Sequence, residues 1–174
     1  MKEFYSMSCV KIHPTSLTCF KAYDVRGELG VNLDVAIAYR VGRAVAQHFQ
    51  AKNVLIGFDA RETSLELATA TMSGICDAGS NVMLIGLAGT EEMYWAVTEF
   101  NACAGIEITA SHNPINYNGM KIVKSGSRPL DDKDDFQAIK LLAENETWVE
   151  NITKGSIQDI SKEARKKYVR RALS

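Results

Sequence analysis

The chain has 174 residues, 46% of them hydrophobic, so it is long enough to form one globular domain with a substantial core. Its net charge is −1 and its pI is about 6.3, a balance that gives no basis for binding nucleic acid or a membrane surface. No apolar run approaches the ~20 residues of a transmembrane helix. The cysteines are scattered, which is typical of reduced thiols in a cytoplasmic protein. They are Cys9, Cys19, Cys76 and Cys103.

Residues 1–17 show no periodicity and no apolar signal-peptide segment, so we expect an N-terminal extension there. The first element is predicted as a strand at Cys19–Gly27, where apolar and polar residues alternate and the run ends in glycine. Helix and strand signals then alternate along the chain. The predicted elements are a helix over 34–50 capped by Asn32 or Asp34, a strand over 53–59, a helix from Thr63 or Ser64 to Gly79, a strand over 81–87 and a helix from Thr90.

An apolar run from Ala102 to Ile108 stops abruptly at a dense polar loop, and a second short apolar run follows at Met120–Val123. We expect two antiparallel strands joined by this loop. Pro114 favours an extended conformation for Asn113, and Asn118-Gly119 is expected to supply a turn that tolerates positive φ. A loop this polar and this constrained indicates a functional site.

The pattern changes after Ser125. The acidic run Asp131–Asp135 could suggest a calcium loop, but it lacks the glycine and the terminal glutamate of an EF-hand. We interpret it as the acidic N-terminus of a helix that packs through Phe136 and Ile139. Residues 147–156 are predicted to form a polar connector, and residues 161–173 a basic helix.

This alternation predicts an α/β fold with three layers, α/β/α, in which helices cover both faces of a mixed, mostly parallel sheet. Ligands of such sheets bind beyond the carboxyl ends of the strands. Polar segments follow three of the predicted strands, at 24–27, 59–64 and 109–118. We expect these segments to converge on one edge of the sheet.

Signatures of the common nucleotide and hydrolase sites are absent from the sequence. There is no G-x-G-x-x-G or P-loop, Ser111 does not lie in G-x-S-x-G, and the histidines are too dispersed for a zinc site. Ser111 could carry a phosphoryl group, because Arg26, Arg61 and Lys121 are available as cations. The residues alone leave open whether Ser111 has this role or only caps a turn.

The polar loop nevertheless resembles a known motif. Thr109-Ala-Ser-His-Asn-Pro114 is similar to the active-site phosphoserine motif of the α-D-phosphohexomutases, and Tyr117-Asn-Gly-Met-Lys121 follows at the family's spacing. Phe20-Lys-Ala-Tyr-Asp-Val-Arg-Gly27 resembles the family's N-terminal signature. Gly89-Thr-Glu-Glu92 and Arg128-Pro129 resemble the bacterial phosphomannomutase branch. The resemblance covers roughly residues 18–150.

The resemblance implies a reversible conversion of mannose 6-phosphate to mannose 1-phosphate through a hexose 1,6-bisphosphate intermediate. Ser111 would carry the phosphoryl group, and its phosphate oxygen would be a ligand of Mg²⁺. His112 and Lys121 would flank the reacting group as acid–base and charge-stabilising residues. Phosphoglucomutase and phosphoglucosamine mutase are the alternatives within the family.

The resemblance also assigns residues to the phosphorylated hexose substrate. Tyr23 and Arg26 would border the same cleft and help to position the sugar. Asn113 and Asn118 would belong to the substrate site and, with the glycine that follows Asn118, would shape the loop. Arg61 is a weaker candidate in the cleft wall.

Members of the family have four domains, and this sequence matches the first. No stretch resembles D-G-D-x-D-R, the magnesium loop of the second domain. We therefore expect domain I at 18–150 and, at 151–174, a connector with the start of a helix that leads to a second domain, which would supply the remaining Mg²⁺ ligands. The isolated chain is expected to be inactive and to self-associate through the surface left exposed. A non-catalytic remnant acting as a binding module is the other alternative.

Overall fold

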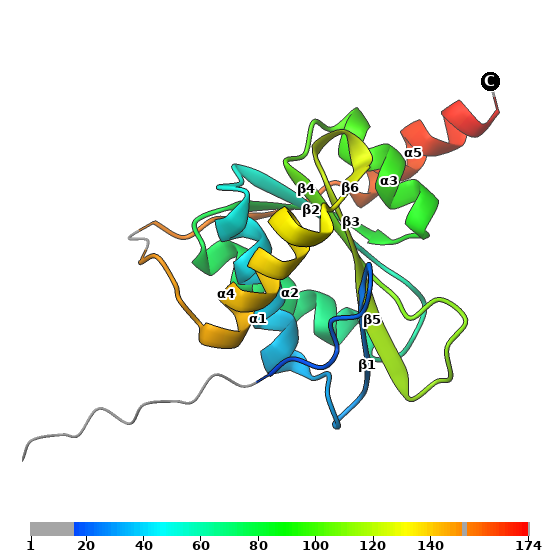
Figure 1. Cartoon of the computed structure of the whole chain (residues 1–174). Helices are drawn as coiled ribbons and strands as arrows, with labels where there is room; N and C mark the ends of the chain where they lie inside the picture. Colours follow the sequence, from blue (N-terminus) through cyan, green and yellow to red (C-terminus); the bar gives the residue numbers. More distant parts are fainter. Residues whose placement is uncertain (1–15, 151–152, 174) are drawn as a thin grey trace, which may run out of the picture.

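The computed structural model describes residues 16–150 and 153–173. Figure 1 shows a mixed sheet with helices packed against it. The strands are β1 (Val25–Glu28), β2 (Asn53–Phe58), β3 (Asn81–Leu87), β4 (Ala104–Ile108), β5 (Tyr117–Lys124), β6 (Arg128–Pro129) and β7 (Ile157–Asp159). The helices are α1 (Val35–His48), α2 (Ser64–Asp77), α3 (Thr90–Glu99), α4 (Gln137–Asn145) and α5 (Ser161–Ala172).

The sheet has the strand order β1-β5-β4-β2-β3-β7, with β6 paired to β5. Strands β4, β2, β3 and β7 run parallel, whereas β5 pairs antiparallel with β4 on one side and with β1 on the other. The predicted antiparallel pairing across the polar loop is therefore present, with Ile108 opposite Met120. Parallel neighbours bring their carboxyl ends to one edge, which is where the loops after β2 and β4 lie.

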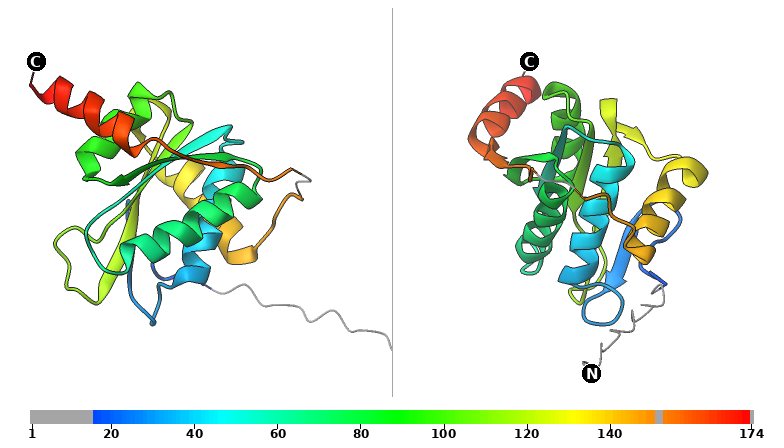
Figure 2. Two further views of the ribbon diagram at one scale, coloured as in Figure 1. Left: turned by 180° about the vertical axis from the view of Figure 1, so that it is seen from behind. Right: turned by 90° about the vertical axis from the view of Figure 1, so that its left-hand side faces the viewer.

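Two hydrophobic cores lie on opposite faces of the sheet, because successive strand residues point to opposite sides. In β2, Val54 and Ile56 belong to the core beneath α1, α2 and α4, whereas Leu55 belongs to the core beneath α3 and α5. In the right-hand view of Figure 2, α4 (yellow) and α5 (red) lie on opposite sides of the molecule. The predicted three-layer α/β/α arrangement is confirmed.

Local capping agrees with the predictions at two helix ends. The Asp34 side chain accepts a hydrogen bond from the Ile37 N–H (2.8 Å) and caps α1. Gly79 adopts φ 83° just after α2, the left-handed conformation that ends many helices. Asp132–Phe136 form one π-helical turn that leads into α4, and Asp135 receives a hydrogen bond from Lys124 (2.8 Å). The acidic run is therefore part of a helix start.

Two local predictions are wrong. The first strand is limited to Val25–Glu28, because the chain turns tightly through residues 21–24 between the bridged residues Phe20 and Val25. Asn118 and Gly119 form no turn and lie inside β5, opposite β1. Gly119 is needed there for space, since a Cβ atom would lie 2.1 Å from the Val25 carbonyl oxygen.

The sheet also extends beyond residue 150. Strand β7, which lies just after the predicted polar connector, pairs parallel with β3, and α5 packs against β3 and α3. All three residues of β7 are exposed, so this edge strand lacks the apolar signal by which the other parallel strands are recognised. Across 16–150 and 153–173, no helix has the length and apolar character needed to cross a membrane. The prediction of an extension at 1–17 falls mostly outside the described residues.

Candidate active site

The polar segments that follow β2 and β4 meet at the carboxyl edge of the sheet. The Asp59 N–H donates to the Ile108 carbonyl (3.0 Å), so the two segments start side by side. The Thr109 N–H donates to the Gly119 carbonyl (3.0 Å) and closes the base of the loop between β4 and β5. This loop, residues 109–116, carries Ser111 and is called the serine loop below.

Ser111 occupies an exposed turn with a backbone conformation that is uncommon for serine. Its φ is 54°, in the left-handed region, where a residue with a side chain persists only if its surroundings hold it there. The Ser111 N–H donates to Thr109 Oγ1 (2.9 Å), and the Asn113 N–H and side-chain amide both donate to the Ala110 carbonyl (3.0 and 2.9 Å). The predicted role of Asn113 in shaping the loop has this geometric basis.

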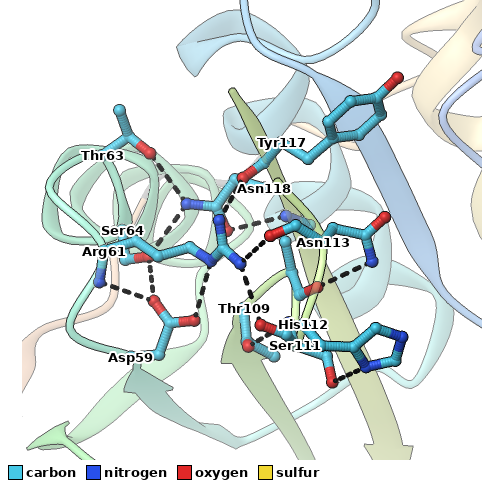
Figure 3. A network of polar contacts seen from close by, with 12 residues as sticks. Asp59, Arg61, Thr63, Ser64, Thr109, Ser111, His112, Asn113, Tyr117 and Asn118 are labelled. Carbon is cyan, nitrogen blue, oxygen red and sulfur yellow. Dashed lines mark hydrogen bonds and ion pairs between the residues drawn. The ribbon is translucent and has the colours of Figure 1, made fainter. Parts of the chain in front are cut away.

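The guanidinium group of Arg61 holds the inner side of the serine loop (Figure 3). Its Nη2 donates to the carbonyls of Ser111 (2.9 Å) and Asn113 (2.6 Å), and its Nη1 donates to those of Pro114 (2.9 Å) and Tyr117 (3.2 Å). Its Nε lies 3.5 Å from the Asp59 carboxylate. The sequence singles out Arg61 as a cleft-wall residue, but its contacts to four carbonyls depend on the path of the loop and carry no signal in the sequence.

Asp59 and Asn118 form the support behind Arg61. The Asp59 carboxylate accepts from the Arg61 N–H (3.0 Å) and from the Ser64 hydroxyl (2.6 Å). The Asn118 side-chain amide donates to the hydroxyl oxygens of Thr63 and Ser64 (2.9 Å each), as Figure 3 shows. Asn118 is fully buried, and its side-chain amide is used within the protein by Thr63 and Ser64.

The exposed Ser111 hydroxyl and the His112 ring are neighbours at the tip of the loop. Ser111 Oγ lies 3.3 Å from His112 Nδ1, and either group can donate depending on the tautomer of the ring. Such a pair can pass a proton between the hydroxyl and the imidazole. The predicted acid–base role of His112 requires this proximity to the Ser111 hydroxyl.

Arg26 connects β1 with the serine loop. Its Nη1 donates to the Ala110 carbonyl (3.3 Å), and its Nη2 pairs with Asp24 (2.6 Å). The Arg26 Nε is buried and makes no hydrogen bond within the described residues. The structure therefore brings the N-terminal signature and the serine motif together, as the predicted convergence requires.

Tyr23 and Lys121 line a second hollow, next to that of Ser111. This hollow, with a volume of about 320 Å³, also contains Asp24, Tyr94 and Leu130. Tyr23 is 86% exposed at the tip of the tight turn before β1. Ser111 and Asn113 line a separate open depression of about 580 Å³ with Asp59 and Arg61. Arg26 lies between the two, since it bonds Asp24 on one side and Ala110 on the other.

Glu107 is a buried acid that the sequence analysis did not single out. Glu107 lies opposite Lys121 in the backbone register of β4 and β5, and it is only 1% exposed. Neither of its carboxyl oxygens has a hydrogen-bond partner among the described residues. Burial, assisted by the charges of nearby carboxylates, first Asp59, raises the pKa of Glu107 to about 9. Its signal in the sequence was a lone charged residue inside the apolar run that ends at Ile108.

Magnesium prefers about six oxygen ligands. Within residues 16–150 and 153–173 no group of three or more His, Cys, Asp or Glu side chains could hold a metal ion. The predicted metal role requires an exposed oxygen atom, and the hydroxyl of Ser111 is exposed. A phosphoryl group on this hydroxyl would offer further oxygen atoms. These residues therefore fit one ligand of a magnesium site and do not fit a complete one.

Comparisons with known proteins agree with this geometry. The domain described as "Phosphoglucomutase/phosphomannomutase, alpha/beta/alpha domain I" matches residues 18–150. A phosphomannomutase of Klebsiella pneumoniae is 46% identical over 149 residues, which cover 84% of this chain and 95% of that protein. A phosphomannomutase of Vibrio cholerae is 46% identical over 150 residues, covering 83% of this chain and 32% of the relative.

A solved structure shows the same fold. The crystal structure of a phosphoglucomutase/phosphomannomutase family protein from Burkholderia thailandensis matches with a TM-score of 0.76 and 27% identity, over 88% of this chain and 36% of that one. The chain thus spans about a third of the length of the relatives from Vibrio cholerae and Burkholderia thailandensis. From the matched residues and the shared fold, the chain belongs to the phosphoglucomutase/phosphomannomutase family.

Proposed function

We propose that the protein containing this chain is a phosphomannomutase that interconverts mannose 6-phosphate and mannose 1-phosphate through a phosphoserine at Ser111. The observation that carries this proposal is the exposed Ser111 hydroxyl, held in a left-handed turn 3.3 Å from His112 Nδ1. The relatives at 46% identity are phosphomannomutases, which favours mannose phosphates over glucose or glucosamine phosphates.

The reaction requires two phosphoryl transfers that are the reverse of one another. A free hydroxyl of the sugar phosphate attacks the phosphorus of phosphoserine 111, the P–Oγ bond breaks, and a hexose 1,6-bisphosphate and the Ser111 alkoxide result. The proton lost by the sugar hydroxyl ends on Ser111 Oγ, and His112, whose Nδ1 lies 3.3 Å from that oxygen, would carry it. After the bisphosphate turns over, Ser111 Oγ attacks the other phosphoryl group and recovers it. Alignment and charge stabilisation supply most of the rate in such transfers.

Arg26, Lys121 and Tyr23 are the residues of this chain that meet the substrate in this proposal. The Arg26 guanidinium lies between the two hollows and supplies positive charge that attracts a phosphate group. Lys121 and Tyr23 line the neighbouring hollow and bind the end of the substrate away from Ser111. An oxygen of the Ser111 phosphoryl group would hold a magnesium ion, which would supply charge stabilisation for the group that is transferred. The other metal ligands come from outside the described residues. A cytoplasmic location is part of this proposal.

We also propose that this chain on its own does not turn over substrate and associates with itself. An open groove of about 650 Å³ between the end of β3 and α5 exposes Leu87 and Val169, beside Lys162, Arg165 and Lys166. Exposed apolar surface of this kind favours association. Sedimentation at increasing concentration tests this part, and a monomer across the whole range would refute it.

A coupled assay on the complete product of the reading frame tests the activity. Mannose 1-phosphate, glucose 1-phosphate and glucosamine 1-phosphate are compared as substrates, with mannose 1-phosphate expected to give the highest kcat/KM. Ser111→Ala is expected to lower kcat by roughly 10³-fold or more, whereas Ser73→Ala, at an exposed serine on α2, leaves it unchanged. Full activity of Ser111→Ala would refute the phosphoserine mechanism. A protein that binds these sugar phosphates without converting them would favour the non-catalytic alternative.

A further inference from the structure

The guanidinium group of Arg61 is almost entirely used by the protein itself. Four of its five N–H donors are taken by the carbonyls of Ser111, Asn113, Pro114 and Tyr117, and the fifth, on Nε, faces Asp59. Its side chain is only 14% exposed. Arg61 is therefore poorly placed to bind an external phosphate, although its charge lies directly behind Ser111.

The carbonyls that face Arg61 determine where the adjacent N–H groups point. In a trans peptide the C=O and the following N–H point in opposite directions, and the described residues contain no cis peptide. Because the Ser111 and Pro114 carbonyls point at Arg61, the N–H groups of His112 and Ile115 point away from it. Neither N–H donates a hydrogen bond to any residue of the described ranges. The Asn113 carbonyl precedes proline, so that peptide offers no donor.

We propose that Arg61 is a positioning residue that sorts the polar groups of the serine loop. It draws the carbonyls to the inner side and leaves the His112 and Ile115 N–H groups on the outer side as donors for the phosphoryl group of Ser111. Outward N–H groups near a residue in the left-handed region, here Ser111, can contribute to a concavity that binds anions. This inference rests on the proposed function, since it assigns a phosphoryl group to the same loop.

The planar fork of arginine is essential to this role. Two Nη atoms, each with two N–H groups, reach four carbonyls from one position, whereas a lysine ammonium has three donors on a single atom. Lysine at position 61 would keep the charge but could not hold all four carbonyls. Substitution by lysine therefore separates positioning of the loop from simple attraction of a phosphate.

The test compares this chain with its Arg61→Lys and Arg61→Ala variants. Arg40→Lys is the matched control, because Arg40 is also partly buried but pairs with Glu146, away from the loop. Amide resonances are followed by ¹H–¹⁵N NMR during titration with inorganic phosphate, and hydrogen exchange is measured in the same samples. Protected amides of β2 and β4 report whether each variant is folded, so Arg61→Lys keeps the test valid if Arg61→Ala unfolds.

In the unsubstituted chain and in Arg40→Lys, phosphate is expected to shift the His112 and Ile115 amide resonances saturably. In Arg61→Lys we expect phosphate affinity to fall about tenfold and the Asn113 and Tyr117 amides to exchange at least about tenfold faster, with the amides of β2 unaffected. Equal phosphate binding by Arg61→Lys and the unsubstituted chain, or unmoved His112 and Ile115 resonances in the latter, would overturn the inference. Ser111 phosphorylation, measured separately by mass, distinguishes this failure from failure of the proposed function.

Discussion

The carboxyl group of Glu107 fills the space that Gly57 leaves by lacking a side chain. A Cβ atom at position 57 would lie 2.2 Å from Glu107 Oε2 and 3.2 Å from Ile85 Cδ1. The register between β2 and β3 shifts at this point, between Ile56 and Gly57. The glycine and the irregular pairing together accommodate a buried acid at the carboxyl edge of the sheet, next to the strand end that leads into the serine loop.

Gly57→Ala is expected to destabilise the chain by about 1–3 kcal/mol, because the new methyl group overlaps the buried carboxyl group of Glu107, which must shift within the core. Urea unfolding measures this cost. In a Glu107→Ala background the same substitution should cost clearly less, since the overlapping oxygen is gone. Equal costs in both backgrounds would show that Glu107 does not fill this space.

The buried acid should also make stability depend on pH. Folded Glu107 keeps its proton up to a pKa of about 9, whereas the unfolded chain loses it near 4.5. Between these values the unfolded state binds fewer protons, so the free energy of unfolding falls as pH rises, by at most roughly 1.4 kcal/mol for each pH unit. Below about pH 4.5 this contribution is fully present.

Glu107→Gln removes the ionisation and should flatten the decline of stability between about pH 5 and pH 9. Urea unfolding midpoints at several pH values measure the slope. Glu150→Gln, at an exposed glutamate, serves as the control and should keep the original slope. A slope that is the same in Glu107→Gln and in the unsubstituted chain would contradict the assignment of a neutral Glu107.

Asn118→Ala is expected to lower the free energy of unfolding by roughly 1–3 kcal/mol. The substitution removes the amide that donates to Thr63 and Ser64 and the oxygen that accepts from the Gly119 N–H, all in a buried position. Asn116→Ala is the control, because Asn116 is exposed and its side-chain amide donates a hydrogen bond to the Glu28 side chain at the surface. Similar costs for the two variants would contradict the supporting role of Asn118.

Gly119→Ala should separate β1 from β5 locally, because a Cβ atom there would meet the Val25 carbonyl oxygen at 2.1 Å. We expect faster hydrogen exchange at Val25 and Arg26 and a lower melting temperature, while β2 and β3 keep their protection. The complete protein should also lose affinity for its substrate, since Arg26 is carried by β1. Unchanged exchange in β1 would show that the strand tolerates a side chain at this position.

The sequence predicts the parallel part of the sheet well, because β2, β3 and β4 are apolar runs that alternate with helices. It does not predict β7, whose exposed residues make it a strand only through its pairing with β3. Gly119 was misread for a related reason: its small size is needed for the approach of β1, which the sequence does not reveal.

The candidate site likewise combines residues that the sequence identifies with contacts that only the structure reveals. A short motif identifies Ser111 and His112, because adjacent residues in a constrained loop carry their own signal. The organising contacts of Arg61 cross about fifty residues of sequence and depend on where four carbonyls point, so no spacing rule could supply them. The isolation of the Glu107 carboxyl likewise becomes visible only when its neighbours are in place.

The most direct test of this account locates the phosphoryl group. The complete product of the reading frame is purified from its native host, incubated with hexose 1,6-bisphosphate and fragmented for mass analysis, alongside its Ser111→Ala variant. We predict one phosphoryl group on Ser111 and none on the variant. A phosphoryl group on another residue, or undiminished interconversion of hexose phosphates by Ser111→Ala, would contradict the central claim that Ser111 is the phosphoryl carrier.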